Sequence, residues 1–202
     1  MLRDRFLQLC GSYTTDTLLA EELWVEIEQR YSAQNRHYHT LVHLRNLLNE
    51  LDSIWQDIAG KRSVLFALFY HDIVYSATAS DNEERSAELA TERMKKLGVD
   101  RNTIQHCNDI ILATKGHGLS GDNDTDMFTD ADLSILGADA SAYAAYAAQV
   151  RQEYSIYPDL LYRPGRKKVL KHFLNMEHIF KTTHFRSLYE KQARLNLQME
   201  IE

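Results

Sequence analysis

The amino-acid sequence predicts an all-α protein, and its composition gives two reasons for this fold class. Proline occurs only twice and glycine eight times in 202 residues, so few positions interrupt a helix. Leucine, alanine, glutamate, glutamine and arginine are abundant, whereas the alternating β-branched runs that are typical of strands are scarce. The length predicts one domain over residues 1–202, and we expect a bundle of about nine helices.

The first half of the chain contains three apolar stripes with helical spacing. The first covers residues 16–31 and has Asp16 as its predicted N-cap. The second covers residues 41–58 and is expected to end at Gly60. The third, residues 64–70, is apolar on every side, which is typical of a helix in the middle of a bundle.

The helices expected in the second half begin at residues that favour helix starts. Asp81, with Glu84 three residues later, resembles a capping box, and the helix that it opens is expected to stop at Gly98. Further helices are predicted to begin near Asp100, near Thr129 to Asp132, near Asp139, near Pro164 and near Thr183. The glycine-rich stretch of residues 115–126 is expected to form the one long loop, a kind of segment that often carries function.

Charge and cysteine usage restrict the class of partner. With 23 Lys and Arg against 29 Asp and Glu the net charge is −6, which argues against binding of a nucleic-acid polymer. Cys10 and Cys107 fit no metal-ligand spacing and are expected to be free thiols in a reducing compartment. The longest apolar run, residues 64–70, is far shorter than the roughly 20 residues that span a bilayer. We therefore expect a cytoplasmic protein without a membrane partner.

Two groups of polar residues are candidates for chemistry. Thr40 is predicted to cap the second helix, which leaves His39 just outside that helix and places His43 in its first turn. His71 and Asp72 end the buried apolar run. An imidazole and a carboxylate lose water there, and the cost is high unless they share a partner such as a metal ion.

A third group is the pair Asp130 and Asp132. Asp130 is predicted to be a helix N-cap, whereas Asp132, two positions later, is placed to point inward. Taken together, a His, then His-Asp, then a final Asp on a helical background resembles the HD-domain superfamily of metal-dependent phosphohydrolases. The segments RHYHTLVHL, FYHDIVY, DNEERSAELA, ILATKGH and DADLSILG, within residues 36–137, are similar to successive motifs of a bacterial subgroup of that superfamily.

The resemblance implies an HD-like helical domain with core motifs at residues 36–137 and helical extensions at both ends. It implies one divalent ion, which is Mn, Fe, Co, Ni, Zn or Mg, with the ligands His43, His71, Asp72 and Asp132. Two neutral imidazoles and two carboxylates neutralise such an ion and leave positions for water and substrate oxygens. Members with two metals use further histidines, and this chain offers only His106 and His117 between the His-Asp pair and the last Asp. One metal is therefore favoured.

The remaining site residues are predicted around these ligands. Glu84 is the predicted general base for the attacking water, with Glu83 as the alternative and completion of the capping box as the structural role of Glu84. Lys115 and His117 are predicted to bind the substrate phosphate, although Lys115 also suits a helix C-terminus.

Asp72 is expected to be a catalytic residue as well as a ligand. His39 and Arg36 are further predicted substrate contacts, and His39 is equally suited to orienting His43. The basic cluster of residues 163–171 is expected to be a solvated helix face.

These features predict a metal-dependent phosphohydrolase that acts on a small phosphorylated metabolite or nucleotide. A non-catalytic regulatory module that binds metal or a nucleotide is the alternative. Oxygen chemistry at a two-metal centre is a third reading, which needs more histidine ligands than the sequence supplies. A homodimer is compatible with the apolar helical surface, but no feature of the sequence singles out its contact.

Overall fold

The computed structural model describes residues 1–201, which contain ten α-helices, one short 3₁₀-helix and no strand. This confirms the predicted all-α fold of about nine helices. The chain forms two compact units, residues 1–129 and 130–202. The boundary falls within helix α7 (Asn123–Leu133), which runs through it without a break. Organisation as one domain stays a prediction.

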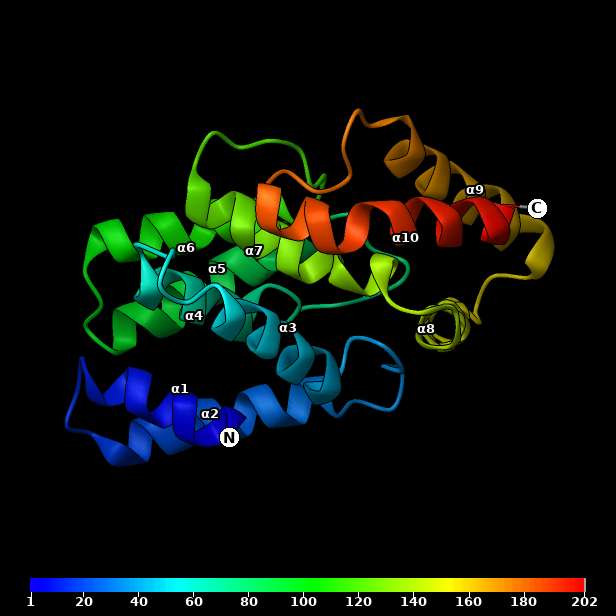
Figure 1. Ribbon diagram of the computed structural model, residues 1–202. Helices are drawn as coiled ribbons and strands as arrows, with labels where there is room; N and C mark the ends of the chain where they lie inside the picture. The colour runs from blue at the N-terminus through cyan, green and yellow to red at the C-terminus, as the bar shows by residue number, and fades with distance from the viewer. Residues whose placement is uncertain (202) are drawn as a thin grey trace. The chain divides into compact units, whose positions relative to one another are not determined.

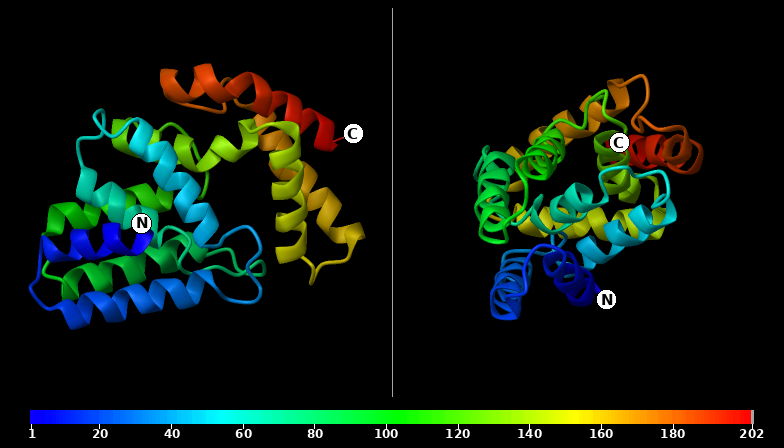
Figure 2. Two further views of the ribbon diagram at one scale, coloured as in Figure 1. Left: turned by 60° about the horizontal axis from the view of Figure 1, so that its bottom comes forward. Right: turned by 90° about the vertical axis from the view of Figure 1, so that its left-hand side faces the viewer.

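The first unit is built around one buried helix. It contains α1 (Leu2–Gly11), α2 (Thr17–Tyr31), α3 (Leu41–Ser53), α4 (Lys61–Tyr70), α5 (Asn82–Lys96), α6 (Arg101–Ala113) and most of α7 (Figure 1). Helix α4 packs against α1, α3, α5 and α6, and α1 lies beside α2 (Figures 1 and 2). Every residue from Ser63 to Tyr70 is buried, as predicted for a helix in the middle of a bundle.

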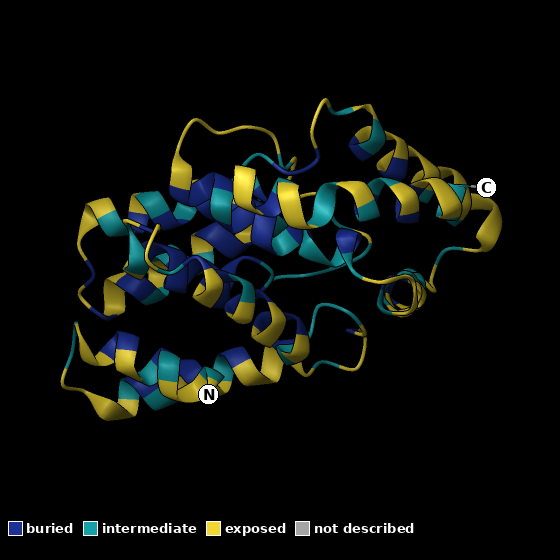
Figure 3. Ribbon diagram, in the orientation of Figure 1, coloured by how far each residue is buried: buried dark blue, intermediate teal, exposed yellow. Residues whose placement is uncertain are grey.

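Aromatic packing fixes α4 in this unit. The ring of Phe69 meets the ring of Phe6 edge-on at 5.0 Å and that of Trp24 at 6.4 Å. Such pairs contribute about 0.5–1.5 kcal/mol each beyond the burial of their area. On α1 and α2 buried positions alternate with exposed ones (Figure 3), as expected for outer helices that pack against an inner one. The C-terminal end of α4 is therefore a rigid place from which to present side chains.

Most predicted helix starts are confirmed. The side chains of Asp16, Thr40, Asp100 and Asp139 each accept a backbone N–H of the first turn. Helix α5 ends at Lys96, and Gly98 follows with a positive φ of 77°, the backbone conformation in which glycine is favoured after a helix.

Three features of the first unit differ from the predictions. Helix α1 was not expected. Helix α3 ends at Ser53 instead of reaching residue 58, because the N–H of Asp57 bonds to the Ile54 carbonyl in a turn outside the helix. The predicted capping box is wrong, since the Asp81 side chain makes no capping bond and Glu84 pairs with a lysine described below.

Helix α7 also begins earlier than expected, at Asn123 instead of near residue 129. The carboxylate of Asp122 accepts the backbone N–H and the hydroxyl of Thr125, so it starts the helix inside the stretch predicted to be loop. The long loop is correspondingly shorter. Asp130 consequently lies in the last turn of α7 and is not the N-cap that the sequence predicted.

The second unit contains the end of α7, the 3₁₀-helix η1 (Ser134–Gly137), α8 (Ala140–Glu153), α9 (Asp159–Asn175) and α10 (Thr183–Ile201). Asp130 is fully buried, and its carboxylate accepts the backbone N–H groups of Lys181 and Thr182 at 2.9 and 2.7 Å. It therefore holds the start of α10, as predicted near Thr183, and does not cap its own helix.

Helix α9 begins at Asp159, five residues before Pro164, so the expected start near Pro164 is wrong. The proline lies inside the helix, where it removes a backbone donor. The carbonyl that therefore receives no helical hydrogen bond from residue 164 is that of Leu160. Leu160 is 85% exposed, so water can reach it.

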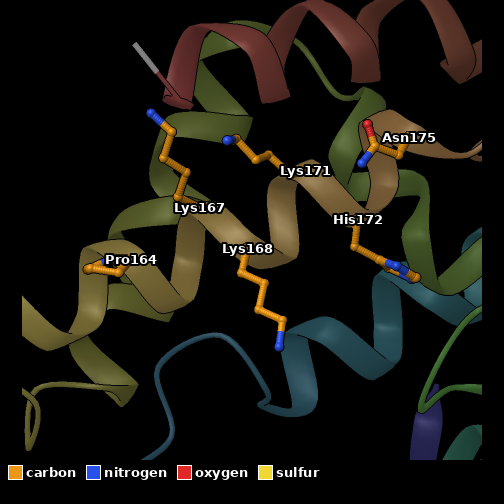
Figure 4. A pocket seen from close by; sticks show the side chains of 6 residues that line it. All are labelled: Pro164, Lys167, Lys168, Lys171, His172 and Asn175. Carbon is orange, nitrogen blue, oxygen red and sulfur yellow. The ribbon is translucent and has the colours of Figure 1, made fainter.

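An open groove of about 510 Å³ lies on α9 (Figure 4). Its lining residues are Pro164, Lys167, Lys168, Lys171, His172 and Asn175. None of the predicted metal ligands is among them. The lysines are exposed, as expected for a solvated basic face. The prediction is wrong for Arg166 of the same cluster, whose side chain is 11% exposed and donates to the Glu200 carboxylate.

Candidate metal centre

The first predicted ligand is placed by a helix cap. The hydroxyl of Thr40 accepts the N–H of Val42 at 3.2 Å and fixes the start of α3. His43 follows in the first turn and is only 4% exposed, whereas His39 lies just outside the helix, as predicted. The ring of Tyr38 contacts the rings of both histidines at centroid distances of 5.0 Å. The RHYH segment thus fixes the orientation of His43 through packing as well as through the cap.

The second ligand is oriented by the end of α4. His71 directly follows the helix and is 1% exposed. Its Nδ1 lies 3.2 Å from the carbonyl oxygen of Leu68 and 3.3 Å from that of Ala67. A carbonyl only accepts hydrogen bonds, so a neutral ring that donates to it carries its proton on Nδ1 and presents the lone pair of Nε2 to its neighbours. This is the arrangement found in metal-ligating histidines.

The side chains of these segments converge on one point. Nε2 of His43 lies 3.1 Å from Nε2 of His71. The Oδ2 atom of Asp72 lies 3.1 Å from Nε2 of His71, 3.7 Å from that of His43 and 3.9 Å from that of His39. Three imidazole nitrogens and one carboxylate oxygen therefore face a common space, with ligand types that suit a divalent transition metal.

The carboxyl group of Asp72 is in its charged form. Burial raises the pKa of Asp72, but His71 and His39 in their protonated forms lower it by more, so the pKa lies well below its ordinary value. An ionised carboxylate beside the Nε2 atoms of buried histidines is the donor set that fits a cation.

The last predicted ligand lies on α7. Phe128, on the same helix, meets the ring of His71 edge-on at 5.6 Å. Asp132 comes four residues later, and residues four apart lie on the same face of a helix. His43, His71 and Asp132 form a group that could hold a metal ion. Among the described residues this is the one such group found, and Asp72 is not a member of it, so the place of Asp72 among the ligands stays a prediction.

Arg36 is placed differently from the prediction. It was expected to contact substrate, but it is 8% exposed and all of its hydrogen bonds are to backbone carbonyls. It donates to the carbonyls of His39, Asp72 and Ile73. Its guanidinium group is therefore bound to the polypeptide around the site, and contact with a substrate stays a prediction.

The two candidate bases have different surroundings. The carboxylate of Glu84 accepts a hydrogen bond from Lys115, and this bond lowers the pKa of Glu84. Glu83 is half-buried, and burial raises its pKa, with the charge of Asp72 acting in the same direction. A carboxylate with a raised pKa is the better proton acceptor near neutral pH. The two carboxyl groups thus differ in the direction of their pKa shifts, and the identity of the base stays a prediction.

The predicted phosphate ligands lie near the glycine-rich loop. The ammonium group of Lys115 donates to the Ser80 carbonyl and to Glu84, so it joins the segment before α5 to the end of α6. His117 adopts a positive φ of 50°, and its N–H closes α6 on the Ala113 carbonyl.

His106 pairs with a different acid from those of the metal group. Its Nε2 lies 3.1 Å from Oδ2 of Asp122, the residue that starts α7. A side chain on Gly60 would come within 2.7 Å of the His106 ring, so the ring packs directly against that backbone. These contacts give His106 a structural role at the start of α7.

Sequence reasoning missed one residue beside the predicted ligands, Tyr75. The ring of Tyr75 lies 4.3 Å from that of His39. It occurs in the FYHDIVY segment, three residues after Asp72, where its proximity to the His-Asp pair was the available signal.

Comparisons of the chain with family models, with curated proteins and with solved structures find no match. The resemblance to the HD-domain superfamily therefore rests on the sequence motifs alone. In the described part of the chain no helix combines the length and the apolar character that a membrane span requires.

Proposed function

We propose that this protein is a metal-dependent phosphohydrolase of the HD-domain type that acts on a small phosphorylated metabolite or nucleotide. One divalent ion would be held by His43, His71, Asp72 and Asp132. The observation that carries the proposal is the convergence of the Nε2 atoms of His43 and His71, 3.1 Å apart, beside the Asp72 carboxylate.

A divalent ion in such a site supplies two effects, a lowered pKa of bound water and polarisation of a phosphoryl oxygen. Both effects promote hydrolysis of a phosphate ester or anhydride near neutral pH. The donor set of imidazole and carboxylate accepts Mn, Fe, Co, Ni, Zn or Mg.

The protein's own groups divide the remaining tasks. Asp72 supplies negative charge close to the histidine nitrogens, and Glu83 accepts the proton of the attacking water. His39, whose Nε2 is 3.9 Å from Oδ2 of Asp72 and whose side chain is 20% exposed, is placed to contact a substrate phosphate. Lys115 and His117 are further phosphate contacts in this proposal. The ammonium group of Lys115 would leave the Glu84 carboxylate and bind the phosphate instead.

The test is turnover by metal-loaded protein. Metal is removed with a chelator, each candidate ion is restored in turn, and hydrolysis of a generic phosphatase substrate and of a nucleotide panel is measured. We expect activity that requires the ion and is abolished in His71→Ala. The matched control is His106→Ala, which removes a histidine that also lies 3.1 Å from an aspartate and should keep activity.

The same assay distinguishes the two candidate bases, Glu83 and Glu84. It also distinguishes the enzyme from the regulatory module and from the two-metal centre. Glu83→Gln should lower kcat by about 10²–10⁴-fold, whereas Glu84→Gln should have a smaller effect. Bound metal without turnover across the panel would favour the regulatory module. Absence of stoichiometric metal binding would refute the proposal, and a metal-to-protein ratio near two would favour the two-metal reading.

A further inference from the structure

Arg36 is a buried cation with an unusual set of partners. Its Nη1 donates to the carbonyl oxygens of His39 at 3.1 Å and Asp72 at 2.7 Å, and its Nη2 donates to that of Ile73 at 2.9 Å. No carboxylate of the described residues pairs with it. The guanidinium carbon instead lies 4.8 Å from the ring centre of Tyr31 and 5.5 Å from that of Tyr75.

Burial of a guanidinium group is costly unless its donors are satisfied. Three backbone carbonyls and two aromatic rings compensate here. A residue that only filled the core could be apolar, because no charge or carbonyl would then need a partner. Arg36 differs, because three carbonyls depend on its donors. The partners of Arg36 therefore indicate what the residue is for.

The three carbonyls lie on the two segments that carry the metal group. The His39 carbonyl lies next to Thr40, which caps α3 and leads to His43. The carbonyls of Asp72 and Ile73 directly follow His71. His43 and His71 are 28 residues apart in sequence, and the Arg36 guanidinium group joins the backbone segments next to them.

We propose that Arg36 is the positioning residue of the metal centre, and the inference rests on the proposed function. By tying the His39 carbonyl to the Asp72 and Ile73 carbonyls, it fixes the separation of the His43 and His71 nitrogens at a value suited to one shared ion. Lysine cannot take this role, because one ammonium nitrogen cannot reproduce the planar fork that reaches three acceptors from two nitrogens.

The experiment measures binding and coordination of Co²⁺ in Arg36→Lys and Arg36→Ala, by competition titration and by the ligand-field absorption spectrum. Both variants should bind Co²⁺ about 10–100-fold more weakly than the wild type, the range seen when the groups that orient metal ligands are lost. Their spectra should also change. Millimolar guanidinium ion should restore the affinity and the spectrum of Arg36→Ala but not those of Arg36→Lys, whose ammonium group occupies the space.

The control is Arg62→Gln, which removes an exposed arginine that also stacks on a tyrosine, Tyr13 at 5.4 Å, but lies outside the site. It should stay within about twofold of the wild type, as surface substitutions usually do. Circular dichroism of the metal-free proteins separates a loss of folding from a loss of positioning. If neither Arg36 variant folds by itself, we expect guanidinium ion to restore both the fold and the Co²⁺ spectrum of Arg36→Ala. Restoration of the fold without the spectrum would overturn the inference. Restoration of neither would also overturn it.

Two failures are distinguishable. If wild-type protein binds no divalent ion, the metal centre itself is wrong and the inference falls with it. If the wild type binds Co²⁺ and folded Arg36→Lys keeps the same affinity and spectrum, the positioning role alone is refuted.

Discussion

The chain contains two histidine–aspartate pairs with the same separation and opposite surroundings. His71 and Asp72 lie 3.1 Å apart, with the His71 side chain fully buried and that of Asp72 20% exposed. His106 and Asp122 also lie 3.1 Å apart, but their side chains are 27% and 52% exposed. Distance alone would give both pairs the same chemistry.

The partners of each pair separate them. His71 is joined by His43 and His39, whose nitrogens face the Asp72 carboxylate. Asp122 instead accepts hydrogen bonds from Thr125 and starts α7. A metal centre needs several donors that converge where water cannot satisfy them, and only the buried pair meets that condition.

The largest expected effect tests whether α4 is the rigid support of the buried pair. Phe69→Ala should lower the free energy of unfolding by about 3–5 kcal/mol, because a fully buried ring is removed between Phe6 and Trp24. Leu112→Ala is the control on α6, the helix of the exposed pair. Leu112 is 41% exposed, so its loss should cost about 0.5 kcal/mol or less. Urea unfolding measures both, and equal losses would contradict the difference between the helices.

A second prediction compares the two aspartates directly. Asp72→Asn should weaken divalent metal binding by about 100-fold or more, since it removes a ligand charge beside three imidazoles. Asp122→Asn should leave the affinity within about twofold of the wild type, because that carboxylate serves a helix start. Isothermal titration with Zn²⁺ or Mn²⁺ measures both constants. Similar losses in the two variants would mean that the exposed pair also binds metal.

The smallest expected effect concerns the capping role of Asp122 and its pH dependence. Asp122→Ala should cost about 1 kcal/mol of stability near pH 7, the usual value of an N-cap. Burial raises the pKa of Asp122, but the bonds from Thr125 and His106 lower it below its ordinary value of 3.8. The folded-state pKa is thus the lower one, so the contribution is present above the unfolded pKa and is lost as pH falls through the folded pKa.

Unfolding of the wild type and Asp122→Ala at several pH values checks this sign. The difference in stability should be constant between about pH 5 and pH 7 and shrink below about pH 4. A difference that grows in acid would contradict the assignment of the carboxylate as the capping group.

Patterns within a few residues of the chain, such as helix periodicity and N-caps, predicted much of the fold. The alternation of apolar stripes gave the helical class, and Asp16, Thr40, Asp100 and Asp139 were found as caps because a cap is a contact within one turn. The run of residues 64–70 was found to be buried because every side of it is apolar. His43 and His71 were found for the same reason, since each lies beside such a local signal.

Local rules failed where a side chain has a distant partner. Asp130 resembles an N-cap in sequence, yet it holds residues 181 and 182. Glu84 resembles the end of a capping box, yet it pairs with Lys115, 31 residues away. Arg36, predicted from the sequence as a substrate contact, donates to carbonyls up to 37 residues away, which the sequence did not indicate. No pattern within a helical turn distinguishes these alternatives.

The sequence by itself determined the helical class, the order His43, His71-Asp72 and Asp132, and the ligand types that suit a divalent ion. Only the tertiary structure decided that the Nε2 atoms of His43 and His71 meet at 3.1 Å, that Arg36 binds the backbone, and that His106 belongs to a helix start. The physical reason is that helix periodicity and capping depend on neighbours a few residues apart, whereas burial and hydrogen-bond choice depend on which distant groups compete for the same donor or acceptor.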